Sequence, residues 1–511
     1  MTWVRVRGGP RHAGPSEWRT PFVLEPCAPT PEERAALRAE HPGRLVERGE
    51  RAWIVATRGE LHAWLRSEPP RAAAWLARSA RTLTAPLRWR LRDRELVLGG
   101  RTRIMGIVNV TPDSFSDGGR FLDPDRALAH ARALVEAGAD LLDVGAESTR
   151  PHAAAVSPET EWARLAPVVG PMARLGVPLT VDTRRAAVAE RALAEGAHGI
   201  NDVDALSDPD LRRLVARSDA GVVLMASQRG ARPEDPVEFT GEHLNRDLER
   251  ALAAGIEPER VILDPGIGFA DDGGASSWTL MAALSAFGAL GAPVLVGHSR
   301  KRFLASFGAE AVQRDPATAT LAALAAAAGV AVVRVHDVAG VRASLEAADR
   351  LVRWPLAYVG LGGNVGDVRS TFRQAVAALG PAVRRVSGLY RSAPWGPVPQ
   401  SPFLNAVVEM DVRDDSPRAL LATLMDIEAR FGRTRAVRWG PRTLDMDLLL
   451  YMDRFVDEPD LAVPHPRILE RPFVLEPLRE LMGMCALPDG TLPTADPAGV
   501  ELLAAGEGWA R

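Results

Sequence analysis

Residues 105–110, Met-Gly-Ile-Val-Asn-Val, are the first of eight short apolar runs that decide the fold. Stretches with helical periodicity, such as residues 124–137, 158–175 and 185–195, lie between the runs. The runs are 105–110, 141–146, 178–181, 199–203, 221–225, 261–263, 293–297 and 330–335. Eight strand-then-helix units over about 250 residues predict a closed (β/α)8 TIM barrel of the α/β class. An open doubly wound sheet is the alternative, but it usually needs fewer units.

Polar residues follow nearly every run, at the end of the barrel where active sites of this fold are built. They are Asn109, Glu147, Asp182, Asn201 with Asp202, Asp264, Ser299 to Lys301, and Arg334 with His336. A single aspartate after a strand usually only caps the next helix. Seven strand ends that together mix carboxylates, amides and cations instead favour a functional rim.

The rim has two chemical characters. Asp182, Asn201 and Asp264 offer acceptors that suit the paired N–H donors of a planar heterocycle such as a 2-amino-4-oxopterin. Lys301, Arg334 and His336 supply positive charge near the last two strands, where barrels often bind phosphate. Lys301 is the only lysine among 62 basic residues, and a compact ammonium fits where a guanidinium fork does not.

Seven motifs in this region resemble, in order, those of dihydropteroate synthases. They are residues 106–119 (GIVNVTPDSFSDGG), 147–151 (ESTRP), 181–183 (VDT), 200–203 (INDV), 264–269 (DPGIGF), 299–301 (SRK) and 334–337 (RVHD). The resemblance spans about residues 101–350 and implies condensation of a pterin pyrophosphate with p-aminobenzoate to 7,8-dihydropteroate.

The same resemblance implies roles for individual residues. The pterin would be bound by Asp182, Asn201, Asp264 and Lys301, with Met225 and Phe269 as apolar walls. One Mg²⁺ with the pyrophosphate would be held by Asn109, Arg334 and His336, and the catalytic residues would be Lys301, Arg334 and His336. The loops over p-aminobenzoate would contribute Thr111, Pro112, Asp113, Ser114, Phe115, Thr149, Arg150 and Pro151.

Three departures from that family keep one other function of the barrel open. Relatives commonly carry His-Met where Ala226-Ser227 stand, and Asp271 and Trp278 replace a lysine and an asparagine. These changes motivate a barrel that binds pterin but lacks synthase activity. A corrinoid-dependent methyltransferase acting on methyltetrahydrofolate is a further alternative. The intact loop at 111–115 argues against it.

After residue 354 the pattern changes to an α+β layer. Strands are expected at 357–361, 383–389, 403–412 and 444–451, and helices at 368–379 and 417–431 on one side of an antiparallel sheet. Asp445 and Asp447 alternate on one strand, so both carboxylates share a face that can hold Mg²⁺ with substrate phosphates. Arg433, Arg435, Arg438 and Arg442 precede them, enough positive charge for a triphosphate.

Residues 438–447, RWGPRTLDMD, resemble the hallmark of hydroxymethyldihydropterin pyrophosphokinases, and matching motifs cover most of residues 356–490. The resemblance implies a ferredoxin-like domain that transfers pyrophosphate from ATP to 6-hydroxymethyl-7,8-dihydropterin. Two Mg²⁺ would be bound by Asp445 and Asp447, and the pterin by Phe403 and Asn405. ATP would be bound by Glu428, Arg433, Arg435, Trp439, Arg442, His465 and Arg471, with Arg433 and Arg442 catalytic.

Three regions are therefore expected: residues 1–87 of unknown role, with helices at 31–40 and 71–82; residues 88–354; and residues 355–511. The net charge of −3 gives no reason to expect a nucleic-acid or membrane partner. Cys27 and Cys485 exclude a disulfide framework, and without an apolar leader at residues 1–10 a cytoplasmic location is expected. By analogy with the barrel family, a homodimer is expected.

Overall fold

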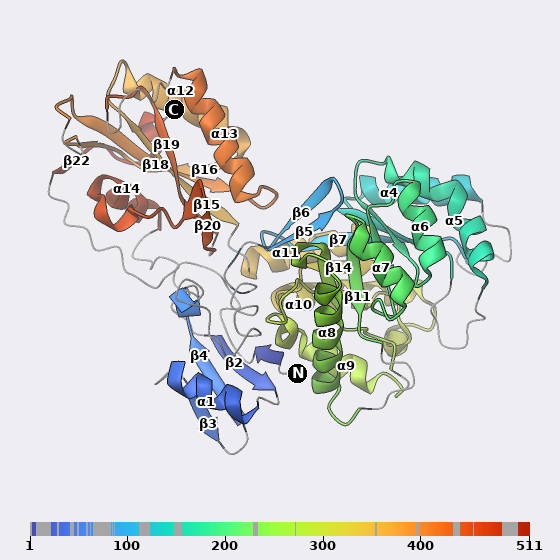
Figure 1. The fold of residues 1–511 in the computed structure, drawn as a ribbon. Helices are drawn as coiled ribbons and strands as arrows, with labels where there is room; N and C mark the ends of the chain where they lie inside the picture. The colour runs from blue at the N-terminus through green and yellow to red at the C-terminus, as the bar shows by residue number, and fades with distance from the viewer. Residues whose placement is uncertain are drawn as a thin grey trace.

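The computed structural model shows an N-terminal sheet, a central barrel and a C-terminal α+β domain (Figure 1). The residues it describes are 3–6, 22–27, 30–40, 45–48, 51–57, 60, 61, 63, 64, 83, 85, 87–111, 123–147, 156–227, 233–270, 272–352, 355–394, 398–432, 440–452, 454–482 and 499–510.

The central sheet is parallel and has eight strands in the order β12-β11-β10-β9-β8-β7-β14-β13. The strands are β7 (Arg103–Asn109), β8 (Leu141–Gly145), β9 (Leu179–Asp182), β10 (Gly199–Asp202), β11 (Gly221–Met225), β12 (Val261–Asp264), β13 (Leu295–Val296) and β14 (Val332–Val335). A parallel bridge between Leu263 and Val294 joins the two edges, so the sheet closes. The predicted barrel is confirmed.

Eight helices alternate with the strands: α4 (Pro124–Glu136), α5 (Pro158–Ala173), α6 (Ala186–Ala194), α7 (Pro209–Arg217), α8 (Pro236–Ala253), α9 (Ala275–Ala282), α10 (Asp315–Ala327) and α11 (Val338–Val352). Local chemistry sets several of their starts. Asp123, Ser157, Asp208 and Asp235 cap four helices through their side chains, and proline follows each of them at the first helical position.

A hairpin covers the end of the barrel opposite the rim, here called the floor. Its strands are β5 (Leu87–Leu91) and β6 (Arg94–Leu98). Trp89 and Leu91 are fully buried in a cluster with Met105, Leu141 and Ile262 from the barrel strands. The hairpin therefore closes the barrel interior from below.

The N-terminal region contains an antiparallel sheet that the sequence did not reveal. Its order is β1-β2-β4-β3, with β1 (Trp3–Val6), β2 (Phe22–Cys27), β3 (Leu45–Arg48) and β4 (Arg51–Ala56). The helix predicted at 31–40 is confirmed as α1 (Pro31–Glu40), whose Leu37 packs with Leu24 and Ile54. The helix predicted at 71–82 lies outside the described residues.

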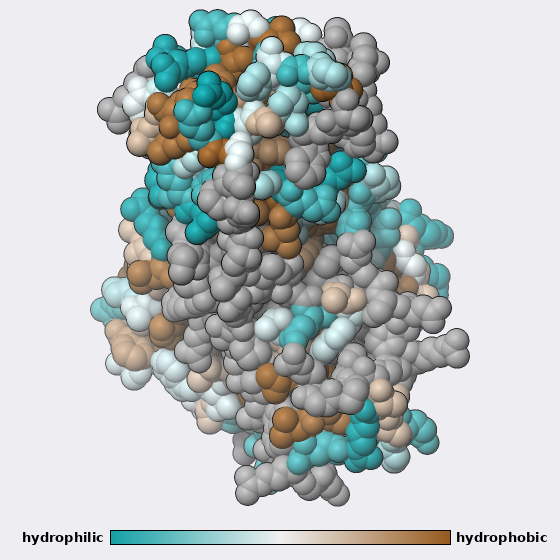
Figure 2. Space-filling view, turned by 90° about the vertical axis from the view of Figure 1, so that its left-hand side faces the viewer, coloured by the Kyte–Doolittle hydropathy of each residue, from teal (hydrophilic) through white to brown (hydrophobic). Residues whose placement is uncertain are grey.

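The C-terminal domain has the predicted ferredoxin-like order of elements: β15 (Leu356–Gly363), α12 (Val368–Leu379), β16 (Val383–Val386), β17 (Leu389–Ser392), β18 (Phe403–Asp411), α13 (Pro417–Arg430) and β19 (Asp445–Tyr451). Added to these are the hairpin β20 (Val456–Glu458) and β21 (Leu461–Val463), α14 (Pro472–Met482) and β22 (Val500–Ala504). Hydrophobic and hydrophilic patches intermix on the face of this domain drawn in Figure 2.

One prediction about this domain was wrong in detail, and one helix was not predicted. The single strand expected at 383–389 is two strands, because Ser387 and Gly388 interrupt the ladder. The two expected helices do lie on one side of the sheet, as α12 and α13 pack on the same face, while the unpredicted α14 packs on the other face against Tyr358, Val407 and Leu450. The apolar stripe of α14 requires this second burial.

Candidate functional site

Asp143, in the middle of β8, is the centre of the barrel's polar network. Its side chain is fully buried and accepts hydrogen bonds from Thr180 Oγ1 at 2.6 Å, Asn201 Nδ2 at 3.0 Å and Arg334 Nε at 2.6 Å. A buried carboxylate is stable only when such donors satisfy it. The sequence prediction did not include Asp143, although a charge within the run Leu-Leu-Asp-Val-Gly could have indicated it.

Arg334 joins Asp143 to the predicted pterin residue Asp182, whose Oδ2 lies 3.2 Å from Arg334 Nη2. Burial raises the pKa of Asp182 to about 7, although Arg334 opposes the shift. One guanidinium therefore serves two carboxylates, and burial makes the second easier to protonate than an ordinary aspartate. A cluster of carboxylate and amide groups suits an amide-like heterocycle edge.

Lys301 follows β13 at the same rim, near Asp264, Arg334 and Asp182. Its ammonium donates to the carbonyl of Ile267 and stands 4.2 Å from the centre of the Phe269 ring. Burial lowers its pKa to about 8, against the pull of Asp264. Burial also raises the pKa of Asp264. Gly268 has φ +83°, and a Cβ there would lie 2.5 Å from Lys301 Cδ, so the turn requires glycine.

The predicted anion-binding side is also assembled. Ser299 Oγ lies 3.0 Å from His336 Nδ1 and accepts from the His336 backbone N–H at 3.2 Å, which orients the imidazole. Asn109 ends β7, the strand that pairs with β14. Met225 ends β11 and is 3% exposed, as an apolar wall would be. Thr111 is described, but Pro112 to Phe115 and Thr149 to Pro151 lie outside the described residues.

Arg185 is a second residue that the sequence prediction missed. It donates to Glu147 at 2.6 and 3.2 Å and to the Val156 carbonyl at 2.7 Å, and it pairs with buried Glu161. Arg185 thus fastens the residues on both sides of the segment that carries Thr149 to Pro151. No local pattern distinguishes it from the many surface arginines.

The C-terminal domain has a separate pocket between the sheet and α14. Its lining includes Gly362 and four residues singled out from the sequence, Phe403, Asn405, Asp445 and Asp447. Register explains the grouping, because Gly362 pairs with Asn405 on one side and with Asp445 on the other. Asn405 is 4% exposed and donates to Ser392 Oγ at 3.0 Å.

Each carboxylate of this pocket has an arginine partner. Arg442 pairs with Asp445, and Arg471 Nη1 lies 3.1 Å from Asp447 Oδ2. His465 Nε2 is 3.9 Å from the same oxygen, and burial lowers its pKa. Glu428 is buried behind β19 and accepts from the Met446 N–H at 2.6 Å, so it supports the strand that carries both aspartates. Arg433, Arg435, Arg438 and Trp439 lie outside the described residues.

Comparison with known proteins divides the chain in the same way. The family model "Pterin binding enzyme" matches residues 105–336, and that of 7,8-dihydro-6-hydroxymethylpterin-pyrophosphokinase matches residues 358–483. A dihydropteroate synthase of Mycobacterium leprae (strain TN) is 42% identical over 268 residues, which cover 49% of this chain and 93% of that protein.

A probable bifunctional folylpolyglutamate synthase/dihydropteroate synthase of Haloferax volcanii is 44% identical over 244 residues, covering 46% of this chain and 29% of that relative. The solved dihydropteroate synthase of Xanthomonas albilineans with 4-aminobenzoic acid is 41% identical and covers 52% of this chain and 97% of its own, with a TM-score of 0.49.

Proposed function

Because the chain belongs to the dihydropteroate synthase family and continues into a hydroxymethyldihydropterin pyrophosphokinase domain, it is a bifunctional enzyme of folate biosynthesis, and we propose which residues carry each reaction. We assign the synthase to residues 88–354 and the kinase to residues 355–511, with residues 1–87 as an N-terminal unit of unknown role. The onset of the floor hairpin at Leu87 supports the first boundary.

In the synthase, Asp182, Asn201 and Asp264 bind the pterin edge, and Asp143 holds Asn201 and Arg334 in place. The observation that carries this proposal is the network centred on Asp143, which joins acceptors from β8, β9 and β10 to Arg334 of β14. The C–O bond to pyrophosphate breaks, the amine nitrogen of p-aminobenzoate bonds to the pterin methylene carbon, and the amine loses a proton. Lys301, Arg334 and His336 stabilise the leaving anion.

In the kinase, Phe403 and Asn405 bind the hydroxymethylpterin, and Arg442, His465 and Arg471 bind ATP phosphates. The hydroxymethyl oxygen attacks the β-phosphorus, so pyrophosphate is transferred and AMP leaves. Arg442 pairs with Asp445, which supports a role for its guanidinium in neutralising phosphate charge beside the proposed metal site. Glu428 keeps β19 in position from behind.

Magnesium fits the kinase pocket, because Asp445 and Asp447 line one cavity on the same face of β19. Mg²⁺ commonly takes one or two protein carboxylates and completes its shell with phosphates and water. We propose two such ions here and one beside Asn109; their chemistry is neutralisation of phosphate charge.

A coupled assay on the purified chain tests the proposal. It contains 6-hydroxymethyl-7,8-dihydropterin, ATP, Mg²⁺ and p-aminobenzoate, and both AMP and dihydropteroate are followed. Both products are expected. AMP without dihydropteroate would support the alternative in which the barrel binds pterin but lacks synthase activity, and Ala226, Asp271 and Trp278 would then be the first positions to restore.

We propose that the chain forms a homodimer through the barrel. Trp278 of α9 packs edge-to-face on Phe303 and Phe307, with ring centres 5.1 and 6.2 Å away. Trp278, Phe307, Val312 and Leu324 are 40–61% exposed, and clustered apolar exposure of this kind marks interfaces. Light scattering of the parent protein should give twice the mass of one chain, and light scattering of a Phe307→Asp variant should give the mass of a single chain. A single chain mass for the parent would contradict the proposal.

The proposed location is the cytoplasm, where ATP is available and where thiols such as Cys27 and Cys485 stay reduced. Within the described ranges, every helix is too short or too polar to cross a membrane. Fractionation of cells that express a tagged chain tests this location.

A further inference from the structure

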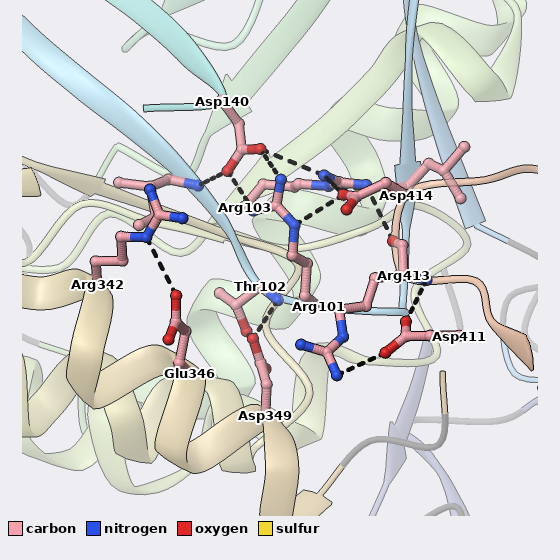
Figure 3. Close-up of polar contacts among 12 residues, drawn as sticks. Arg101, Thr102, Arg103, Asp140, Arg342, Glu346, Asp349, Asp411, Arg413 and Asp414 are labelled. Carbon is pink, nitrogen blue, oxygen red and sulfur yellow. Dashed lines mark hydrogen bonds and ion pairs between the residues drawn. The ribbon is translucent and has the colours of Figure 1, made fainter. Parts of the chain in front are cut away.

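The kinase domain contacts the floor of the barrel through the loop after β18. Asp414 in that loop accepts hydrogen bonds from Arg101 Nε at 2.8 Å and from Arg103 Nη1 at 2.6 Å (Figure 3). Both arginines also bind Asp140, which Arg101 Nη1 reaches at 2.8 Å and Arg103 Nη1 at 3.3 Å. These four residues are here called the ionic lock.

The lock joins two domains far apart in sequence at the start of two barrel strands. Arg103 is the first residue of β7, and Asp140 immediately precedes β8. Asp140 also accepts from the Ile104 N–H at 2.8 Å, which fixes its carboxylate to the barrel. The side chains of Arg103 and Asp140 are only 5% and 7% exposed. Arg103 and Asp140 therefore form a rigid, buried ion pair on the barrel, and Asp414 of the kinase domain adds the second carboxylate.

Backbone approach and further contacts extend this interface. A Cβ at Gly100 would lie 2.7 Å from the Arg413 carbonyl, so only glycine allows the two loops to come this close. Arg103 Nη2 donates to the same carbonyl at 3.3 Å. Arg454 Nη1 donates to the Leu83 carbonyl at 3.0 Å, and Arg88 of β5 lies 3.4 Å from Glu458 of β20. The lock and the Arg88–Glu458 pair join the kinase domain to the barrel at two separate places, and Arg454 ties it to the N-terminal region, so rotation of the kinase domain on the barrel is opposed.

Each active site lies at the far end of its own domain from this interface. In the barrel, Arg103 begins β7 at the lock and Asn109 ends it at the rim, about 20 Å away for six steps of a strand. In the kinase domain, Leu356 pairs with Asp411 beside the lock, whereas Gly362 pairs with Asn405 in the pocket, again about 20 Å away. The hairpin β5–β6 fills the barrel floor between them.

We infer that the ionic lock holds the two catalytic domains with both sites opening away from their interface, so that the pterin pyrophosphate made in one site leaves the protein before it enters the other. The inference rests on the proposed function for the identity of the intermediate. The fusion then fixes the ratio of the two activities without passing the intermediate directly.

The charge balance of the lock makes Asp414 its sensitive member. Burial alone would raise the pKa of Asp414, but Arg101 and Arg103 outweigh burial and lower it. Without this carboxylate, two guanidinium groups share Asp140, and one of them is almost fully buried. Asp415, the next residue, has a pKa raised by burial and by its acidic neighbours, so it offers a matched control within the same loop.

A distance measurement tests the geometry without depending on turnover. Spin labels are attached at Arg302→Cys beside the rim and at Ser401→Cys beside the kinase pocket, in a chain lacking the two native cysteines and diluted with unlabelled chain. The expected distance exceeds about 30 Å, from the strand lengths on either side of the interface. Labels within about 20 Å of each other would overturn the inference.

The same labels test the lock. Asp414→Asn should broaden the distance distribution, and Asp415→Asn should leave it as in the parent. An unchanged distribution in the Asp414 variant would overturn the role given to the lock. Both variants should keep the two separately assayed activities, because Asp414 lies outside both sites.

Isotope dilution tests the path of the intermediate. Each activity is first measured alone, so that loss of either would count against the proposed function and not against the path. Labelled 6-hydroxymethyl-7,8-dihydropterin is then converted with ATP and p-aminobenzoate in the presence of unlabelled dihydropterin pyrophosphate, which must be in large excess over the labelled intermediate formed. With a tenfold excess of unlabelled dihydropterin pyrophosphate, the label found in dihydropteroate should fall about tenfold. An equal mixture of the Asp445→Asn and Lys301→Arg chains, in which the intermediate must leave one chain to reach the other, should show the same fall. Label that withstands the excess in the parent chain but not in the mixture would overturn the inference.

Discussion

The two pterin sites of this chain differ in how their carboxylates are neutralised before a ligand arrives. In the barrel, Asp143 and Asp182 share Arg334, and their side chains are 0% and 13% exposed. In the kinase pocket, Asp445 and Asp447 each have one arginine and are 18% and 35% exposed. The first arrangement is a buried network, and the second is a pair of open ion pairs.

This difference agrees with what we propose each site binds. A heterocycle edge is recognised by fixed acceptors, and buried fixed acceptors need a permanent cation. A nucleotide with its metal ions brings its own charges, so carboxylates with the proposed metal role would exchange arginine for metal. Rigid burial serves the synthase, and accessible pairing serves the kinase. Each prediction below tests one side of this contrast.

The largest effect is expected in the open pocket. Asp445→Asn removes a carboxylate from the proposed metal site and should lower AMP formation by about 10³-fold, a size typical of lost electrostatic stabilisation of a transition state. Synthase turnover with supplied dihydropterin pyrophosphate should not change. Asp426→Asn, which alters an exposed pair with Arg430 on α13, is the control. Parallel loss of both activities would instead indicate misfolding.

The buried network should respond in stability as well as in rate. Asp143→Ala leaves Arg334 with Asp182 as its remaining partner and should lower the free energy of unfolding of the barrel by about 3 kcal/mol. Asp447→Ala breaks a half-exposed pair and should cost less than about 1 kcal/mol. Urea titration followed by tryptophan fluorescence measures both. An equal loss of unfolding free energy in the two variants would contradict the contrast between a buried network and open ion pairs.

The barrel and most of its rim could be predicted from the sequence because the carboxyl ends of all strands in this fold meet on one face. A polar residue that follows a strand in the sequence therefore lies at the rim. Asp143 was not predicted because it lies within a strand, where a charged residue interrupts the apolar pattern and does not mark the end of the strand. Arg185 was not predicted because only the folded chain brings it to Glu147 and Val156. The N-terminal sheet was missed because its strands are only four to six residues long. Contacts between domains, such as that of Asp414, leave no local pattern at all.

A smaller effect is expected from changing the shape of a buried cation while keeping its charge. Lys301→Arg places a planar fork where an ammonium donates to the Ile267 carbonyl and faces the Phe269 ring. Synthase turnover should fall about 10- to 100-fold, as expected when a group in a packed site is misplaced by about 1 Å. Kinase turnover should be unchanged. Arg302→Lys, an exposed neighbour, is the control, and parental synthase rates in Lys301→Arg would refute the assigned role.

The smallest effect is a pH dependence that only the buried site should show. Burial raises the pKa of Asp182 to about 7, so as the pH falls through 7 its carboxylate gains a proton and one anionic acceptor for the pterin is lost. Burial lowers the pKa of Lys301 to about 8, so as the pH rises through 8 its positive charge is lost. The kcat/KM of the synthase should therefore fall on both sides of a maximum between about 7 and 8, with slopes near tenfold per pH unit.

Asp182→Asn separates the two limbs of that profile. The variant cannot titrate at residue 182, so the decline below pH 7 should disappear while the decline above pH 8 remains, at a lower overall rate. The kinase activity of the same preparation should keep the parental profile, because residue 182 belongs to the barrel. A decline below pH 7 that persists in Asp182→Asn would place the titrating group elsewhere, with Asp264 as the next candidate because burial raises its pKa as well.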